Sequence, residues 1–136
     1  MPTIVSADTL ELRTEQDIVR ARQAVRKASQ ELGFSLVDQT KMVTAASELA
    51  RNTVTHGGGG TMAMEVLSDG GVRRGLRLHF SDQGKGIPDI GLAMTDGWSS
   101  GSGLGLGLTG AKRLCNEFEL DTRPGQGTRV SITRWT

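Results

Sequence analysis

Two glycine-rich segments in the second half of the chain limit its possible folds more than any other feature. The first covers residues 82–87 (DQGKGI), and the second covers residues 101–108 (GSGLGLGL). Because glycine lacks a Cβ atom and exposes its backbone N–H groups, such segments can wrap closely around a phosphate. The second segment leads into a helical pattern, whose first N–H groups would face the same anion. Its apolar positions are Leu108, Ala111, Leu114, Cys115 and Phe118. The two segments therefore indicate a nucleotide site.

Three better-known phosphate-binding motifs do not fit these segments. Residues 105–110 (GLGLTG) match the dinucleotide fingerprint, but a glycine-rich loop precedes them where that fingerprint needs a strand. A P-loop needs Ser or Thr after Gly-Lys, whereas Lys85 is followed by Gly86. The sequence also lacks the His-Arg-Asp and Asp-Phe-Gly motifs of eukaryotic protein kinases. A different nucleotide-binding fold is needed.

Length and composition narrow the class of protein. A chain of 136 residues suits one domain with a real core. Its net charge is +1 and its basic residues are scattered, so nucleic-acid binding is not expected. One cysteine excludes an internal disulfide framework, and no apolar run approaches the roughly 18 residues of a membrane span. With no visible signal peptide, we expect a cytoplasmic protein that does not enter a membrane.

Apolar periodicity predicts two helices in the first half of the chain. The first covers residues 15–32, with Thr14 able to cap its start and Gly33 placed to end it. We expect its Arg and Lys residues to form a solvated outer face. The second covers residues 36–55, with Ser35 as its N-cap. A run of four glycines, 57–60, then breaks the helix and forms a connection.

Alternating apolar residues predict strands, and one strand leads directly into the first glycine segment. The strands are expected at residues 9–13, 62–66, 76–80, 118–122 and 128–134. With period two, Asp82 continues the inward-facing row of the third strand. A carboxylate there is costly to bury unless a donor binds it. Asp82 could simply cap the turn at Gln83-Gly84, or it could accept a hydrogen bond from an adenine amino group.

Glu48 and Asn52 lie four positions apart in the second predicted helix, so their side chains share one face. Taken alone, the pair suits an exposed helical surface. Beside the glycine segments, a carboxylate and a neutral oxygen ligand suit water activation and Mg²⁺ binding. His56 could extend this line toward a phosphate, although a residue that caps the helix C-terminus is the favoured interpretation.

Three segments together resemble the motifs of one superfamily. Residues 48–52 (ELARN) are similar to the N box of the GHKL ATPases and kinases. Residues 82–86 and 101–107 resemble the first and second glycine boxes. Within this superfamily the chain most resembles the bacterial serine/threonine kinases of the anti-sigma-factor type, and among these the RsbT-like switch kinases. The resemblance extends from residue 14 to the C-terminal strand.

The resemblance implies a fold and a domain organisation. We expect an α/β two-layer sandwich, the Bergerat fold, in which a mixed, mostly antiparallel sheet carries helices on one face. Residues 1–136 would form a single ATP-binding kinase domain with an ATP lid at about 87–107. Trp98, within the lid, could anchor a partner or cover the nucleotide.

The resemblance also implies roles for individual residues. Glu48 would be the catalytic base, Asn52 would supply an oxygen ligand to Mg²⁺, and Asp82 would select adenine. Lys85 stands at a position that varies in the family, and its side chain most simply extends into solvent. The remaining nucleotide-binding residues would be Gly84, Gly86, Ile87, Gly103, Leu104, Gly105, Gly107, Leu108 and Thr128.

The function implied by the resemblance is protein phosphorylation. Such a kinase transfers the γ-phosphoryl group of ATP to a Ser or Thr of a STAS-domain antagonist protein. It also binds and activates a PP2C-type phosphatase, as a partner switch in bacterial stress or sigma-factor signalling. Two alternatives stay open: an anti-sigma factor that sequesters a sigma subunit, and a non-catalytic ATP-dependent interaction module. A histidine kinase is disfavoured because the chain has no room for a phosphoacceptor helical hairpin.

Overall fold

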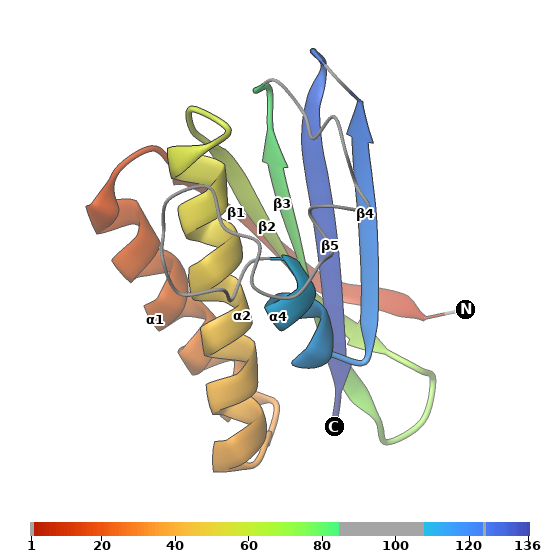
Figure 1. The fold of residues 1–136 in the computed structure, drawn as a ribbon. Coiled ribbons are helices and arrows are strands. Elements are labelled where there is room, and N and C mark those ends of the chain that lie inside the picture. Colours follow the sequence, from red (N-terminus) through yellow and green to blue (C-terminus); the bar gives the residue numbers. More distant parts are fainter. Residues whose placement is uncertain (1, 85–107, 124) are drawn as a thin grey trace.

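A five-stranded antiparallel sheet forms one layer of the computed structural model, and helices form the other (Figure 1). The structure describes residues 2–84, 108–123 and 125–136. The strand order is β1-β2-β3-β5-β4. No helix in these ranges is long and apolar enough to cross a membrane. The elements are β1 (Thr3–Leu12), α1 (Glu15–Glu31), α2 (Leu36–Thr55), β2 (Gly60–Ser68), β3 (Arg74–Asp82), α4 (Leu108–Arg113), β4 (Glu117–Arg123) and β5 (Gly127–Trp135).

The predicted two-layer class is confirmed, with α1, α2 and α4 on the same face of the sheet (Figure 1). Each of the four pairings between described strands is antiparallel. In the helix layer α2 lies between α1 and α4. The core fills the space between the layers, where Met42 and Leu49 of α2 and Leu78 and Phe80 of β3 are buried.

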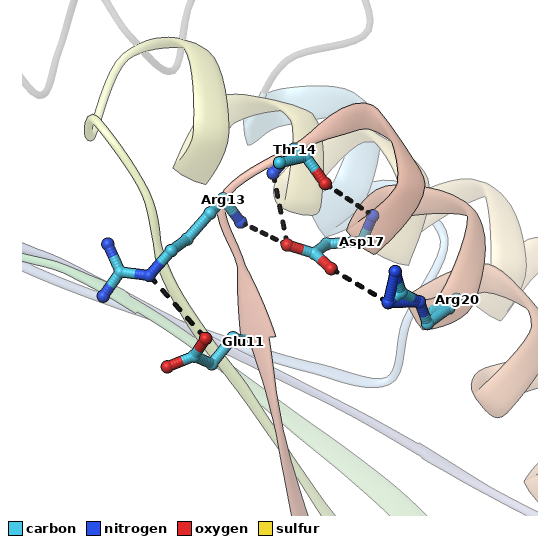
Figure 2. Close-up of polar contacts among 5 residues, drawn as sticks. All are labelled: Glu11, Arg13, Thr14, Asp17 and Arg20. Carbon is cyan, nitrogen blue, oxygen red and sulfur yellow. Dashed lines mark hydrogen bonds and ion pairs between the residues drawn. The ribbon is translucent and has the colours of Figure 1, made fainter.

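The predicted start of α1 at Thr14 is confirmed by a reciprocal cap (Figure 2). Thr14 Oγ1 accepts a hydrogen bond from the Asp17 backbone N–H at 3.2 Å. Asp17 Oδ2 accepts from the backbone N–H groups of Arg13 at 2.9 Å and Thr14 at 3.2 Å. The bond from the Arg13 N–H, with further help from Thr14 and Arg20, holds the pKa of Asp17 below its ordinary value. These contacts fix the angle at which the chain leaves β1.

The second helix begins at the predicted N-cap. Ser35 Oγ accepts from the Asp38 N–H at 3.1 Å. Between the two helices, Gly33 takes a φ of 83°, a backbone conformation that residues with a side chain rarely adopt. The short connection therefore forces α1 and α2 to run antiparallel as neighbours.

Two predicted boundaries are wrong. The first strand is twice as long as residues 9–13, because β1 pairs with β2 from Thr3 to Leu12 although most of its side chains are exposed. Backbone pairing, rather than apolar alternation, defines that strand. The helical pattern expected from Leu108 through Phe118 ends at Arg113, and Phe118 lies on β4 opposite Ile132, in agreement with the strand predicted at residues 118–122.

Candidate functional site

A polar row of residues ends the apolar face of the sheet beneath the helices. Asp82 pairs across the strands with Gly60 of β2 and Thr128 of β5, and Thr128 pairs in turn with Thr122 of β4. The hydroxyl oxygens of Thr122 and Thr128 are 2.9 Å apart and hydrogen-bonded. The preceding row on the same face is apolar and consists of Met62, Phe80, Val130 and Leu120. The predicted inward orientation of Asp82 is therefore confirmed by the strand register.

One of the two oxygens of the Asp82 carboxylate caps the turn that follows β3. Its Oδ1 accepts a hydrogen bond from the Gly84 N–H at 2.8 Å, so the predicted turn-capping role is present. Within the described ranges, no hydrogen bond or ion pair is made by Oδ2. The turn-capping role and a ligand-binding role are thus compatible, because each uses a different oxygen.

Two glycines pack tightly around Asp82: Gly57, from the run of four glycines predicted to form a connection, and Gly127, at the start of β5. A Cβ atom added to Gly57 would lie 2.4 Å from Asp82 Cγ and 2.6 Å from Oδ2. A Cβ atom on Gly127, whose φ is 97°, would lie 2.2 Å from the Asp82 carbonyl oxygen. Sequence reasoning missed Gly57 because only the tertiary approach of the α2–β2 connection to β3 creates this requirement.

The predicted pair Glu48 and Asn52 lies on the flank of α2 that faces away from α1. Val43 packs toward α1, and Glu48 and Asn52 follow it by five and nine residues, so at 3.6 residues per turn they lie roughly 140° and 180° around the helix. Both side chains are half-buried. Among the described residues, neither side chain takes part in a hydrogen bond or ion pair, so their oxygens can bind a ligand.

The end of α2 connects this flank with Asp82. The backbone carbonyl oxygen of Asn52 accepts hydrogen bonds from the backbone N–H groups of His56 at 2.8 Å and Gly57 at 3.2 Å. His56 is the C-cap of the helix, which confirms the favoured prediction for it, and its side chain is exposed. The chain then turns at Gly57 against the Asp82 side chain. The C-terminal end of α2 thus positions both Asn52 and the glycine that packs against the Asp82 carboxylate.

Of the other predicted nucleotide-binding residues, only some fall within the described ranges. Leu108 opens α4, and its side chain is buried in the core with 3% exposure, so any contact with a nucleotide would come from its backbone. Gly84 and Thr128 flank Asp82. Residues outside the described ranges are Lys85, Gly86, Ile87, Trp98, Gly103, Leu104, Gly105 and Gly107.

Cys115 follows α4 and is half-buried, in agreement with its predicted place on the apolar side of that segment. Its Sγ donates to the Ala111 carbonyl at 3.2 Å. Burial raises the pKa of the Cys115 thiol to about 11, so the thiolate that would act as a nucleophile is disfavoured near neutral pH.

A pocket of about 350 Å³ opens at the same end of the sheet. Asp82, Gly127 and Thr128 contribute to its wall. The side chains of Ser81 and Arg129, which also line it, alternate with Asp82 and Thr128 and therefore point to the face without helices. This pocket continues around the strand ends and is not by itself the space between the two layers.

Comparison with known proteins agrees with this arrangement. Residues 37–135 match the family described as histidine kinase-, DNA gyrase B-, and HSP90-like ATPase. The chain is 48% identical over 124 residues to the serine/threonine-protein kinase RsbT of Bacillus subtilis, covering 91% of this chain and 92% of that protein. It is 30% identical to the anti-sigma F factor of Clostridium acetobutylicum, covering 84% of this chain and 82% of that protein.

Solved structures agree with the fold alone. The RsbU and RsbW domains of a Mycobacterium tuberculosis protein superpose with a TM-score of 0.60 at 21% identity, over 98% of this chain and 31% of that chain. The SiaB–SiaC complex of Pseudomonas aeruginosa gives a TM-score of 0.54 at 14% identity, over 98% of this chain and 91% of that chain.

The chain belongs to the family of histidine kinase-, DNA gyrase B-, and HSP90-like ATPases. Within this family it groups with the serine/threonine-protein kinases of the RsbT type, since the similarity to RsbT extends over nearly the whole length of both chains. The predicted resemblance, drawn from three short motifs, is confirmed by these matches.

Proposed function

We propose that the chain is a cytoplasmic kinase that transfers the γ-phosphoryl group of ATP to a Ser or Thr of a STAS-domain antagonist. It would also bind and activate a PP2C-type phosphatase, as a partner switch in bacterial stress or sigma-factor signalling. The observation that carries the proposal is the 48% identity to a serine/threonine-protein kinase along 91% of the chain. We take residues 1–136 as one ATP-binding domain with its lid at about 87–107.

The polar row at the end of the sheet is the proposed adenine end of the site. The Oδ2 oxygen of Asp82 would accept a hydrogen bond from the adenine amino group while Oδ1 stays bound to the Gly84 N–H. The hydroxyl group of Thr128, which lies opposite Asp82 in the sheet, would contact the same ring. Gly57 and Gly84 allow the α2–β2 connection and the turn after β3 to pack against each other beside Asp82, because a Cβ atom at either position would collide with its neighbours.

The protein residues of the proposed site suit Mg²⁺ only when the phosphate oxygens of ATP supply further ligands. In the described ranges, no three His, Cys, Asp or Glu side chains lie together as a metal site. Mg²⁺ in nucleotide sites takes one or two protein oxygens and completes its shell with phosphate oxygens and water, so the half-buried Asn52 carboxamide fits as that protein ligand. Bound there, the ion would neutralise charge on the phosphates during transfer.

Glu48 is the proposed general base. Its carboxylate would take the proton of the acceptor hydroxyl while the hydroxyl oxygen forms its bond to the γ-phosphorus. The bond from that phosphorus to the β–γ bridging oxygen breaks, and ADP leaves. One turn of α2 separates Glu48 from Asn52, so the base and the ligand of the metal lie on the same flank of a rigid helix.

The anti-sigma factors define a second candidate function, supported by the 30% identity to one of them. In that alternative the chain would sequester a sigma subunit and use ATP to control the complex. Binding measurements against a purified sigma subunit and a PP2C-type phosphatase distinguish the two, because each function needs a different partner.

The test of the proposed chemistry is phosphoryl transfer by a Glu48→Gln variant, which keeps the shape of the side chain but removes its basicity. We expect transfer from radiolabelled ATP to a purified STAS-domain protein to fall by about 10²- to 10⁴-fold. ATP affinity, measured by calorimetry, should stay within a factor of about three, because the base does not bind adenine. Glu31→Gln, a change at the exposed end of α1, is the matched control and should transfer normally.

Transfer at the wild-type rate by Glu48→Gln would show that Glu48 is not the base. If the wild-type protein binds ATP, transfers nothing to the STAS protein and binds a sigma subunit, the anti-sigma function replaces the proposed one. ATP binding with neither transfer nor a sigma complex would favour the non-catalytic interaction module.

A further inference from the structure

A chain of hydrogen bonds leads from β4 to the proposed adenine end of the site. Thr122 of β4 lies opposite Thr128 of β5, and Thr128 lies opposite Asp82 of β3, all at the same end of the sheet (Figure 1). The Thr122 hydroxyl donates to the backbone carbonyl of Gly127 at 3.3 Å. The hydroxyl oxygens of Thr122 and Thr128 are hydrogen-bonded at 2.9 Å. Both threonine side chains are half-buried and share the face beneath the helices with Asp82.

The number of hydrogens in this chain gives its bonds a direction. A threonine hydroxyl has one hydrogen to donate and two lone pairs that accept. Because the hydroxyl hydrogen of Thr122 is donated to Gly127, the Thr122 oxygen can only accept from Thr128. The hydroxyl hydrogen of Thr128 therefore points to β4, and the Thr128 oxygen presents only lone pairs to a ligand beside Asp82.

The Asp82 carboxylate presents the same kind of group. An ionised carboxylate accepts hydrogen bonds and donates none, and Asp82 Oδ1 already accepts from the Gly84 N–H. The side chains of Asp82 and Thr128 thus form an end of the site that can accept but cannot donate. The amino group of adenine has two N–H bonds, one for Asp82 Oδ2 and one for Thr128, directly or through one bridging water.

A purine with an oxygen at position 6 does not match this end of the site. In hypoxanthine and guanine a carbonyl replaces the amino group of adenine, so its lone pairs would face the lone pairs of the two side chains. Polar groups that lose their hydrogen bonds in this way discriminate strongly between related ligands.

We propose that Thr122 is a positioning residue for nucleotide selection. By accepting the hydroxyl hydrogen of Thr128, it keeps the adenine end of the site free of donors and so favours ATP over 6-oxopurine nucleotides. This proposal rests on the proposed function, in which adenine lies at Asp82 and Thr128. It adds a residue of β4 that lies outside the three sequence motifs and acts on the nucleotide through Thr128.

A purely structural role for Thr122 would have a different signature. Hydrogen-bonded threonines on neighbouring strands stabilise a sheet by themselves. Loss of that stabilisation would weaken the binding of all nucleotides alike, whereas a free Thr128 hydroxyl would change the preference among them. The ratio of two nucleotide affinities therefore separates the two roles.

The test is a Thr122→Val variant, which keeps the shape of the side chain but lacks the hydroxyl. Affinities for ATP and for inosine triphosphate, which has a carbonyl at position 6, are measured by calorimetry with Mg²⁺. The wild type should prefer ATP by about tenfold or more. In Thr122→Val this preference should fall by about three- to tenfold, chiefly through tighter binding of inosine triphosphate, because the Thr128 hydroxyl can then turn and donate to the carbonyl.

Two further variants serve as controls. Thr61→Val makes the same change at a half-buried position of β2 that lies opposite Ser81, on the face of the sheet without helices, and should keep the wild-type preference. Thr122→Ser retains a hydroxyl at the original position and should keep most of the preference.

Equal ATP preference in Thr122→Val and Thr61→Val would overturn the proposal and leave the kinase function intact. So would a preference that falls as far in Thr122→Ser as in Thr122→Val, because the shape of the side chain would then matter rather than its hydroxyl. A wild type without any preference for ATP would also overturn it. If the wild type and Asp82→Asn bind ATP equally, or the wild type binds none, the proposed adenine site is itself rejected, and the role of Thr122 with it.

Discussion

At the scale of single residues, the candidate site depends on positions where the chain has no side chain as much as on its carboxylates. Asp82 is held by one hydrogen bond to Gly84, while Gly57 approaches its side chain so closely that no Cβ atom fits there. Such a fit fixes the rotamer of the carboxylate and leaves its second oxygen available. The orientation of Asp82 is therefore determined by the α2–β2 connection as well as by β3.

Replacing Gly57 by Ala should disturb nucleotide binding without removing any polar group. The added Cβ would lie 2.4 Å from Asp82 Cγ, so the carboxylate or the connection must move. We expect ATP affinity, measured by isothermal titration calorimetry, to fall at least tenfold.

Gly58→Asn is the matched control for this change. Gly58 has a φ of 72°, which Asn tolerates better than most residues, and a Cβ there would meet nothing within 4 Å. Its ATP affinity should stay close to that of the wild type. Unchanged affinity in Gly57→Ala would show that the Asp82 side chain can relax without leaving the site, and that the close approach of Gly57 is not needed for ATP binding.

At the scale of secondary-structure elements, helix α2 presents candidate site residues, whereas the strands carry core residues on one face and a polar network on the other. Helix α2 contacts α1 on one flank and presents Glu48 and Asn52 on the other. The strands carry core residues on the face beneath the helices and a polar network on the opposite face. In that network Glu65 Oε1 accepts from Arg77 Nε and His79 Nε2, each at 2.7 Å, and His79 Nδ1 is 2.6 Å from Ser131 Oγ. Three strands, β2, β3 and β5, are joined by these bonds.

This network should make stability depend on pH in the acid range. Burial alone would raise the pKa of Glu65, but the hydrogen bonds from Arg77 and His79 outweigh it and hold the pKa below the ordinary 4.5. A depressed carboxyl pKa stabilises the fold above the ordinary value, and this stabilisation is lost as pH falls below it. Glu65→Gln should therefore lower the unfolding free energy by about 1–2 kcal/mol at pH 7, and by much less near pH 3.

Urea unfolding of both proteins at the two pH values checks this prediction. Glu119→Gln, on an exposed position of β4, is the control and should change the unfolding free energy by less than about 0.5 kcal/mol at either pH. If the unfolding free energy of Glu65→Gln is lower than that of the wild type by the same amount at pH 7 and pH 3, Glu65 acts through packing rather than through its charge.

The sequence predicted most of these elements but not all of their ends. The caps at Thr14 and Ser35 and the inward row ending at Asp82 follow from local chemistry and from periods of 3.6 and 2, and all are present. The early start of β1 at Thr3 was not predictable, because its exposed side chains carry no apolar pattern and only pairing with β2 orders them. The requirement for Gly57 was hidden for the same reason, since it depends on a contact between distant segments.

At the scale of the whole molecule, the proposed site joins the two layers of the fold. Asn52 and Glu48 belong to the helix layer, whereas Asp82 and Thr128 belong to the sheet. A nucleotide bound to all four would connect α2 with β3 and β5 across the end of the core. Because such a ligand binds the folded state and not the unfolded chain, it should raise the unfolding free energy of the whole domain.

Thermal unfolding with and without MgATP tests this connection. At an ATP concentration about 100 times Kd, the added stability should be about 2.7 kcal/mol, which for a domain of this size raises Tm by roughly 10 °C. Asp82→Asn should lose most of this increase, because the amide has lost one acceptor oxygen beside the adenine group. Asp8→Asn, on the exposed edge strand β1, should keep the full increase. An equal rise in Tm for the wild type and Asp82→Asn would mean that ATP binds the domain without using the sheet, and that the polar row is not its adenine end.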